Sequence, residues 1–209
     1  MQERFFNGIY RCFAPDLVGF GENKEMPFAY SLDDYIVSVK DYMQQNGIVK
    51  PDVIAHSFGA RIAVKMASLD KDIFGKIIIT GGAGLKPKRK LNYFIKKIKF
   101  SVLKKFVKRE KLKKYYSSDY LALSPIMRES FKKIISEHLD KNAKVVENKV
   151  LLVYGEKDTE TPLYMAKRYK NYIKNSTLKI IKGEGHFCFL TAFNYFNTLA
   201  REFLLDKGE

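Results

Sequence analysis

Ser57 stands where a nucleophilic hydroxyl is expected in an α/β chain. The apolar run 52–56 favours a strand and the pattern that begins at Phe58 favours a helix, so Ser57 falls on the turn between them. Small residues at Ala55 and Gly59 leave room for the sharp turn that exposes such a hydroxyl, although the usual Gly-x-Ser-x-Gly pattern has alanine first here. The backbone N–H of Phe58, at the helix start, can stabilise an oxyanion. Alone, such a string is also typical of an ordinary helix start.

A carboxylate and an imidazole follow two later apolar runs. Asp158 comes just after the run 149–154, and His186 comes after the run 177–181. The carboxyl ends of parallel strands share one edge of the sheet, so we expect both side chains to meet Ser57 there. Singly, Asp158 is typical of a helix cap and His186 of a loop histidine. Together, in the order Ser…Asp…His, they favour a nucleophile, an orienting acid and a general base.

The remaining candidate groups are less suited to chemistry. His56 adjoins the nucleophile in the chain and His138 lies in an inserted segment, so both are poorer bases. Cys12 and Cys188 belong to no Cys-x-x-Cys or Cys/His cluster, which leaves a metal site unsupported and indicates no cofactor. Two cysteines are too few for a disulfide framework and favour a reducing, cytoplasmic compartment. No stretch is apolar and long enough to span a membrane, and residues 1–10 lack the pattern of a signal peptide.

Elements that position these groups follow from the hydrophobic pattern. Apolar runs separated by helical stripes predict an α/β fold with a mostly parallel sheet flanked by helices. Ser31 with Asp34 forms a capping box at the start of one helix. The expected strands are 10–14, 52–56, 76–80, 149–154 and 177–181, and the expected helices are 31–47, 58–69, one from about 162, and 191–205.

Charge is concentrated in one segment. The chain of 209 residues has a formal net charge of +15, and residues 86–114 hold fourteen Lys or Arg and one acid, Glu110. The segment lies in a stretch, 85–145, without a clear strand, which predicts a helical insert. Its lysines are typical of a solvated helix face, or of a surface that binds an anionic membrane. Nucleic acid is the weaker partner, because the aromatic residues there share the apolar stripe instead of forming a stacking platform.

Four stretches give the chain a family resemblance. They are residues 14–21 (Ala-Pro-Asp-Leu-Val-Gly-Phe-Gly), the turn at 55–59, Gly155-x-x-Asp158 and Gly185-His186. With these the sequence resembles the α/β-hydrolase superfamily, and it looks closest to small lidded esterases and carbon–carbon bond hydrolases. The resemblance implies a core of residues 1–84 and 146–209, with 85–145 as a helical cap or lid. A serine at position 57 argues against the epoxide hydrolases and haloalkane dehalogenases, which use an aspartate nucleophile.

The resemblance implies a serine hydrolase that cleaves a carboxylic ester, or a related acyl or carbon–carbon bond, in a small-molecule substrate. Ser57, Asp158 and His186 would be catalytic, Phe58 N–H would bind the oxyanion, and no cofactor is implied. Family members begin with two or three further strands and a His-Gly loop that supplies a second oxyanion donor. We therefore expect an N-terminally truncated fold with weak activity, from a truncated gene model or a fragment in preference to a genuinely shortened protein. The alternative is a truncated or degenerate hydrolase fold without activity that binds anionic membrane or nucleic acid through residues 86–114.

Overall fold

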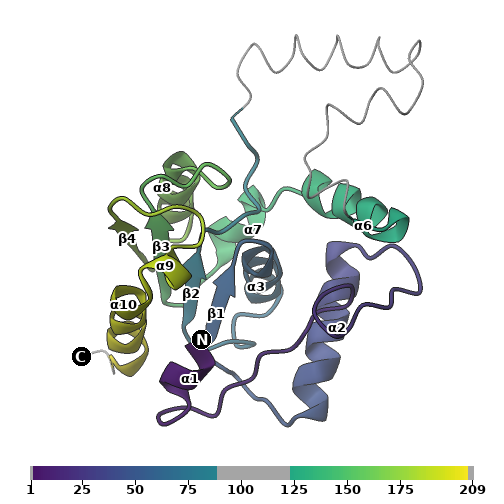
Figure 1. The fold of residues 1–209 in the computed structure, drawn as a ribbon, viewed down its shortest axis with the longest axis horizontal. Coiled ribbons are helices and arrows are strands. Elements are labelled where there is room, and N and C mark those ends of the chain that lie inside the picture. The colour runs from purple at the N-terminus through teal and green to yellow at the C-terminus, as the bar shows by residue number, and fades with distance from the viewer. Residues whose placement is uncertain (1, 89–122, 207–209) are drawn as a thin grey trace.

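A parallel sheet lies at the centre of the protein, with helices on both sides (Figure 1). The computed structural model describes residues 2–88 and 123–206. The strands are β1 (Val53–His56), β2 (Ile77–Thr80), β3 (Val150–Gly155) and β4 (Ser176–Ile181). They are hydrogen-bonded in the order β1-β2-β3-β4, and every neighbouring pair is parallel. The predicted fold class, a mostly parallel sheet flanked by helices, is confirmed.

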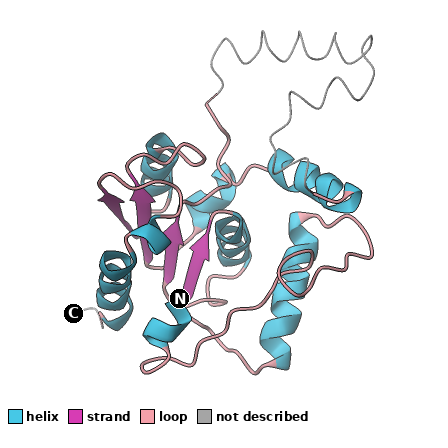
Figure 2. Cartoon of the chain, viewed as in Figure 1, coloured by secondary structure: helices cyan, strands magenta, loops and turns pink. Residues whose placement is uncertain are grey.

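Helices connect the strands, as Figure 2 shows in cyan. Those described are α1 (Gln2–Phe6), α2 (Leu32–Gln45), α3 (Phe58–Leu69), α6 (Pro125–Ser136), α7 (Asp140–Val145), α8 (Leu163–Tyr172), α9 (Cys188–Thr191) and α10 (Phe193–Leu205). The predicted helices over 31–47 and 58–69 and the one near residue 162 are confirmed. The helix expected over 191–205 is interrupted at Ala192, whose ψ of 44° lies outside the helical range.

Alternating side chains of the central strands supply two separate cores. Ile77 and Ile79 of β2 belong to the cluster that includes residues of α2, α3, α7 and α8. Ile78 of β2, with Leu151 and Val153 of β3, belongs to a second cluster with residues of α1, α9 and α10. Successive side chains of a strand point to opposite faces, so unbroken apolar runs are what a sheet covered on both sides requires.

Residues 10–14, which were expected to form a strand, form none. In the structure residues 11–17 form neither a helix nor a strand and have no ladder partner. Their side chains are instead engaged locally: the Arg11 guanidinium lies 4.7 Å from the Phe13 ring centroid, and Phe13 meets Tyr42 of α2 edge to face at 6.5 Å. Tyr10 and Cys12 pack instead against the core cluster that holds residues of α1, α9 and α10. A strand is stabilised by pairing with a neighbouring strand, and this segment contacts helices on both sides.

The described end of the insert is fastened to α3. The buried Arg61 guanidinium donates at 2.9 Å to two carbonyl oxygens, Ile134 O and Glu137 O, where α6 ends. Lys65 pairs there with Glu137 and, on the other side, with Asp33 of α2. Most of the basic segment 86–114 lies outside the described residues. Within the residues that the structure describes, no helix is both long and apolar enough to cross a membrane.

Candidate active site

Ser57 occupies the turn between β1 and α3 in a backbone conformation that L residues rarely adopt. Its φ is 47° and its ψ is −104°, which only a well-restrained turn can hold. Ser57 N donates to Thr80 O at 3.1 Å, and the N–H groups of Ala60 and Ala83 each donate to Ser57 O at 3.2 Å. The turn is therefore tied to the end of β2 and to the loop that follows it.

Small neighbours allow this turn to form. Ala55 is buried on β1, and a methyl group placed on Gly59 would lie 3.8 Å from the Ala55 Cβ, an ordinary van der Waals distance. The Ala55 methyl group therefore does not crowd the start of α3, which begins directly after Ser57.

Asp158 and His186 form a buried pair beyond the carboxyl ends of β3 and β4. His186 Nδ1 lies 2.9 Å from Asp158 Oδ2, and the two side chains are 6% and 0% exposed. Thr161 donates twice to the same carboxylate, from its N–H to Oδ1 at 2.8 Å and from its hydroxyl to Oδ2 at 2.7 Å. The structure thus brings together two of the three predicted catalytic residues.

The contact between Asp158 and His186 shifts the pKa of each group in the direction opposite to that caused by burial. Burial alone would raise the pKa of Asp158, but hydrogen bonds from His186 and Thr161 bring that pKa below its usual value. Burial alone would lower the pKa of His186, but its hydrogen bond to Asp158 and the charges of Asp158 and Glu160 bring that pKa above 6.5. The carboxylate holds a proton on Nδ1, so Nε2 is the nitrogen that can exchange one.

A glycine lets the histidine loop reach this position. A Cβ on Gly155, the last residue of β3, would lie only 2.2 Å from Gly185 O and 2.5 Å from Glu184 O. Lys157 N also donates to Glu184 O at 2.7 Å, which fastens the two loops together. Because Gly155 has no side chain, the loop after β4 can pack on the loop after β3. This contact places His186 next to Asp158.

The imidazole of His186 lies beside the strand end that carries Ser57. Its ring centroid is 4.6 Å from that of His56, the residue before Ser57, and a Cβ on Gly81 would lie 3.0 Å from two of its ring atoms. Within the described chain, no hydrogen bond joins His186 to the Ser57 hydroxyl. His186 Nε2 lies instead 3.4 Å from Glu160 Oε2. Hydrogen bonds between a base and its nucleophile often become short only when substrate binds.

His56 is unsuited to act as the base. Burial and the nearby His186 lower its pKa to about 4, so the ring is neutral at physiological pH. Its Nδ1 donates to Thr80 O at 3.0 Å, which orients the ring against Phe189, 4.6 Å away. His56 is therefore an aromatic neighbour of His186.

Phe58 supplies a backbone donor next to the serine. As the first residue of α3 it precedes any carbonyl to which its N–H can bond within the helix, so this donor is one of the free amides of a helix start. Its ring packs between Phe20, stacked at 5.8 Å, and Tyr35, edge to face at 5.0 Å. These contacts fix the orientation of the first turn of α3.

Two neighbours of the pair were not identified from the sequence. The three-residue spacing from Asp158 to Thr161 is typical of a turn in which a side chain bonds to the backbone, so this signal was available. Glu160 gave no such signal, because the direction of an exposed side chain depends on the loop that carries it.

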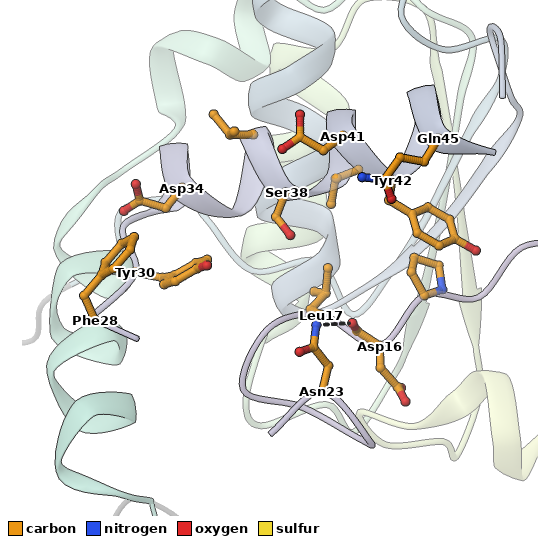
Figure 3. A pocket seen from close by; sticks show the side chains of 13 residues that line it. Asp16, Leu17, Asn23, Phe28, Tyr30, Asp34, Ser38, Asp41, Tyr42 and Gln45 are labelled. Atoms are coloured by element: carbon orange, nitrogen blue, oxygen red, sulfur yellow. Dashed lines mark hydrogen bonds between the residues drawn. The ribbon is translucent and has the colours of Figure 1, made fainter. Parts of the chain in front are cut away.

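A cavity of about 430 Å³ lies elsewhere, between α2 and residues 15–30 (Figure 3). Its wall includes Asp16, Asp34, Tyr30 and Tyr42, and none of the predicted catalytic residues lines it. Across the described ranges, no group of three His, Cys, Asp or Glu side chains is arranged to hold a metal ion.

Comparisons with known proteins agree with this architecture. A family model described as the alpha/beta hydrolase fold matches residues 3–109, and a second, described as a TAP-like protein, matches residues 132–208. A curated haloalkane dehalogenase from Bradyrhizobium diazoefficiens is 28% identical over 64 residues, which are 31% of this chain and 21% of the dehalogenase. This chain thus matches only about a fifth of that relative's length.

Solved structures resemble the chain over most of its length. The meta-cleavage product hydrolase CumD from Pseudomonas fluorescens IP01 has a TM-score of 0.74 at 21% identity, over 99% of this chain and 84% of CumD. The serine hydrolase CCSP0084 from Cycloclasticus zankles has a TM-score of 0.73 at 17% identity, over 97% of this chain and 82% of the CCSP0084 chain. With the parallel sheet and the family-model match to more than half of its residues, the chain belongs to the α/β hydrolase fold family.

Proposed function

We propose that the protein is a serine hydrolase that cleaves a carboxylic ester, or a related acyl or carbon–carbon bond, in a small molecule. Ser57 is the nucleophile, His186 the general base and Asp158 the group that orients it. The observation that carries the proposal is the buried 2.9 Å contact between His186 Nδ1 and Asp158 Oδ2, at the sheet edge where the strained Ser57 turn also lies. An isolated structural histidine needs neither feature.

The proposed reaction uses one nitrogen twice. His186 Nε2 takes the Ser57 proton as the oxygen attacks the carbonyl carbon, and Phe58 N–H stabilises the resulting oxyanion. Collapse breaks the bond to the leaving group, which takes the proton from His186 and leaves an acyl ester on Ser57. His186 then removes a proton from water as the water attacks the ester. The bond to Ser57 breaks, the Ser57 oxygen takes that proton from His186, and the acid is released. Asp158 stabilises the imidazolium in both steps.

The nature of residue 57 separates this reaction from that named for the curated relative. Serine supports an acyl-enzyme pathway, in which the covalent intermediate is an ester of the Ser57 oxygen. Haloalkane dehalogenation is therefore not proposed for this chain, although a 64-residue stretch is similar to such an enzyme.

We further propose that residues 85–145 form a cap over a core of residues 1–84 and 146–209. The described end of the cap supports a firm attachment, because α7 packs against α3 and α8 and its Ala143 is fully buried. Both cysteines are free thiols, which agrees with the proposed cytoplasmic location.

A fluorophosphonate probe tests the proposal, because it reacts with a serine only when that serine is activated. We expect the protein to be labelled, and Ser57→Ala to abolish the labelling. Ser38→Ala, on the side of α2, is the matched control and should leave labelling unchanged. Equal labelling of the wild type and Ser57→Ala, or no labelling of a folded wild type, would refute the proposal.

A further inference from the structure

His186 lies between two carboxylates. Asp158 Oδ2 is 2.9 Å from Nδ1, and Glu160 Oε2 is 3.4 Å from Nε2. A neutral imidazole has one N–H and one bare nitrogen, so it can donate to only one of the two acids. The doubly protonated ring can donate to Asp158 from Nδ1 and pair its charge with Glu160 at Nε2. The arrangement therefore suits an imidazolium, with a hydrogen bond on one side and an ion-pair contact on the other.

The two carboxylates differ in how firmly they are held. The Asp158 side chain is fully buried and accepts further hydrogen bonds from Thr161 and from Glu160 N. The Glu160 side chain is 62% exposed. The 2.9 Å bond from Glu160 N to Asp158 Oδ1 fixes the backbone of Glu160 beside the ring, while its carboxylate can turn into solvent. Asp158 is thus a permanent partner of His186, and Glu160 is a partner that can leave.

Other titratable groups near His186 are neutral or are bound elsewhere. His56, on β1, is neutral because its pKa is about 4. Burial raises the pKa of the Cys188 thiol, on α9, so the thiol stays protonated. Glu184, on the histidine loop, accepts a hydrogen bond from the Thr191 hydroxyl. Asp158 and Glu160 are the two acids whose charges raise the pKa of His186.

From this geometry we propose that Glu160 is a positioning residue that clamps protonated His186 away from Ser57. The clamp rests on the proposed function, since it assigns to Glu160 the same nitrogen, Nε2, that must accept the Ser57 proton. When His186 loses its Nε2 proton, the lone pair repels the carboxylate, Glu160 turns outward and Nε2 becomes available to Ser57. Glu160 would thereby set the lowest pH at which the hydrolase works.

The direction of the effect follows from the charge. The Glu160 carboxylate stabilises the imidazolium, so replacing it with an amide should lower the pKa of His186 and leave more neutral base at acid pH. An ion pair with one exposed partner alters a proton equilibrium by roughly twofold to fivefold. Labelling by a fluorophosphonate should therefore be about twofold to fivefold faster in Glu160→Gln at pH values below the wild-type pKa, and equal to wild type well above it.

The experiment combines two readouts on Glu160→Gln, Glu160→Asp and a control. Glu147→Gln is the control, because it removes one negative charge near the start of β3, at the opposite end of that strand from Asp158. The titration of His186 is followed by NMR, which needs only three histidine signals to be assigned. The rate of fluorophosphonate labelling is measured over the same pH range. We expect both midpoints to move to lower pH in Glu160→Gln, to move less in Glu160→Asp and to stay unchanged in Glu147→Gln.

The two readouts separate the clamp from the proposed function. An unchanged His186 titration in Glu160→Gln would overturn the clamp, even if the protein were labelled normally. A shifted titration with a parallel shift in labelling supports it. A shifted titration in a protein that is never labelled would support the contact between Glu160 and His186 and refute the hydrolase.

Discussion

Replacing Thr161 with valine tests how the orienting carboxylate is held. The Thr161 hydroxyl donates to Asp158 Oδ2 at 2.7 Å, and the same oxygen faces His186 Nδ1 at 2.9 Å. Thr161 is buried, at 4% exposure, and valine has nearly the same shape, so the change removes a hydrogen bond without opening a cavity. The backbone bond from Thr161 N to Asp158 Oδ1 remains.

The magnitude follows from the charge on the acceptor. A hydrogen bond to an ionised group contributes about 1.5–3 kcal/mol to the free energy of unfolding. Asp158 keeps its bonds from His186 and from two backbone N–H groups, so we expect a loss of roughly 1.5–2 kcal/mol at pH 7, in the lower part of that range. The folded-state pKa of Asp158 is lowered, so its stabilising effect is present above its unfolded-state pKa of about 3.9 and disappears as pH falls through the folded value. The cost of Thr161→Val should shrink accordingly in acid.

Urea unfolding at pH 7 and at the lowest pH where the fold persists measures this cost. Thr198→Val is the control, because the exposed Thr198 hydroxyl donates to the uncharged Asn194 O within α10, and it should change the free energy by less than about 0.5 kcal/mol. A loss below 0.5 kcal/mol for Thr161→Val, or a loss that does not shrink in acid, would refute this account of how Asp158 is held.

Three further outcomes are expected. Asp158→Asn should retain the fold but slow ester hydrolysis by about three to four orders of magnitude, since the amide favours the wrong tautomer of His186; a loss below tenfold, measured as kcat, would contradict the assigned role. Gly155→Ala should cost about 1–3 kcal/mol of stability in urea unfolding, because the new methyl group overlaps Gly185 O, whereas Gly185→Ala, with nothing within 4 Å of its methyl group, should fold normally. The pH profile of kcat/KM should fall on the acid side with a midpoint above 6.5, because the pKa of His186 is raised; a midpoint at or below 6.5 would argue against His186 as the base.

Elements with strong local signals were predictable. The capping box places the start of α2 at Leu32: Ser31 N donates to Asp34 Oδ2 at 2.7 Å and Asp34 N donates to Ser31 Oγ at 3.3 Å. The strand and helix around Ser57 were equally clear, because the hydrophobic pattern changes from an apolar run to a helical stripe at that residue.

Elements that depend on distant partners were not predictable. Residues 10–14 have the composition of a strand, but whether an apolar run pairs depends on which segment lies beside it in the fold, and here Phe13 contacts α2 while Tyr10 and Cys12 pack against the core of α1, α9 and α10. The interruption at Ala192 was likewise not predictable, because no glycine or proline lies at that position.

The positions of the site residues were predicted from the sheet topology more than from local sequence pattern. That Asp158 and His186 meet follows from both lying after parallel strands, although they are separated by 28 positions in the chain. The contact of Glu160 with Nε2 could not be predicted, because it depends on the path of one loop and on the rotamer of one exposed side chain.

One face of the sheet is built from both ends of the described chain. Gln2 Nε2 donates to Phe189 O across 187 positions, and Phe6 of α1 shares its core with Phe196 and Leu204 of α10. During synthesis on a ribosome, chains tend to fold from the N-terminus as segments emerge. Here Ile78, Leu151 and Val153 have no α10 to cover them until residues 193–205 have been synthesised. Between the synthesis of β3 and that of α10, we therefore expect this apolar face of the sheet to be exposed to solvent, where it is prone to aggregation.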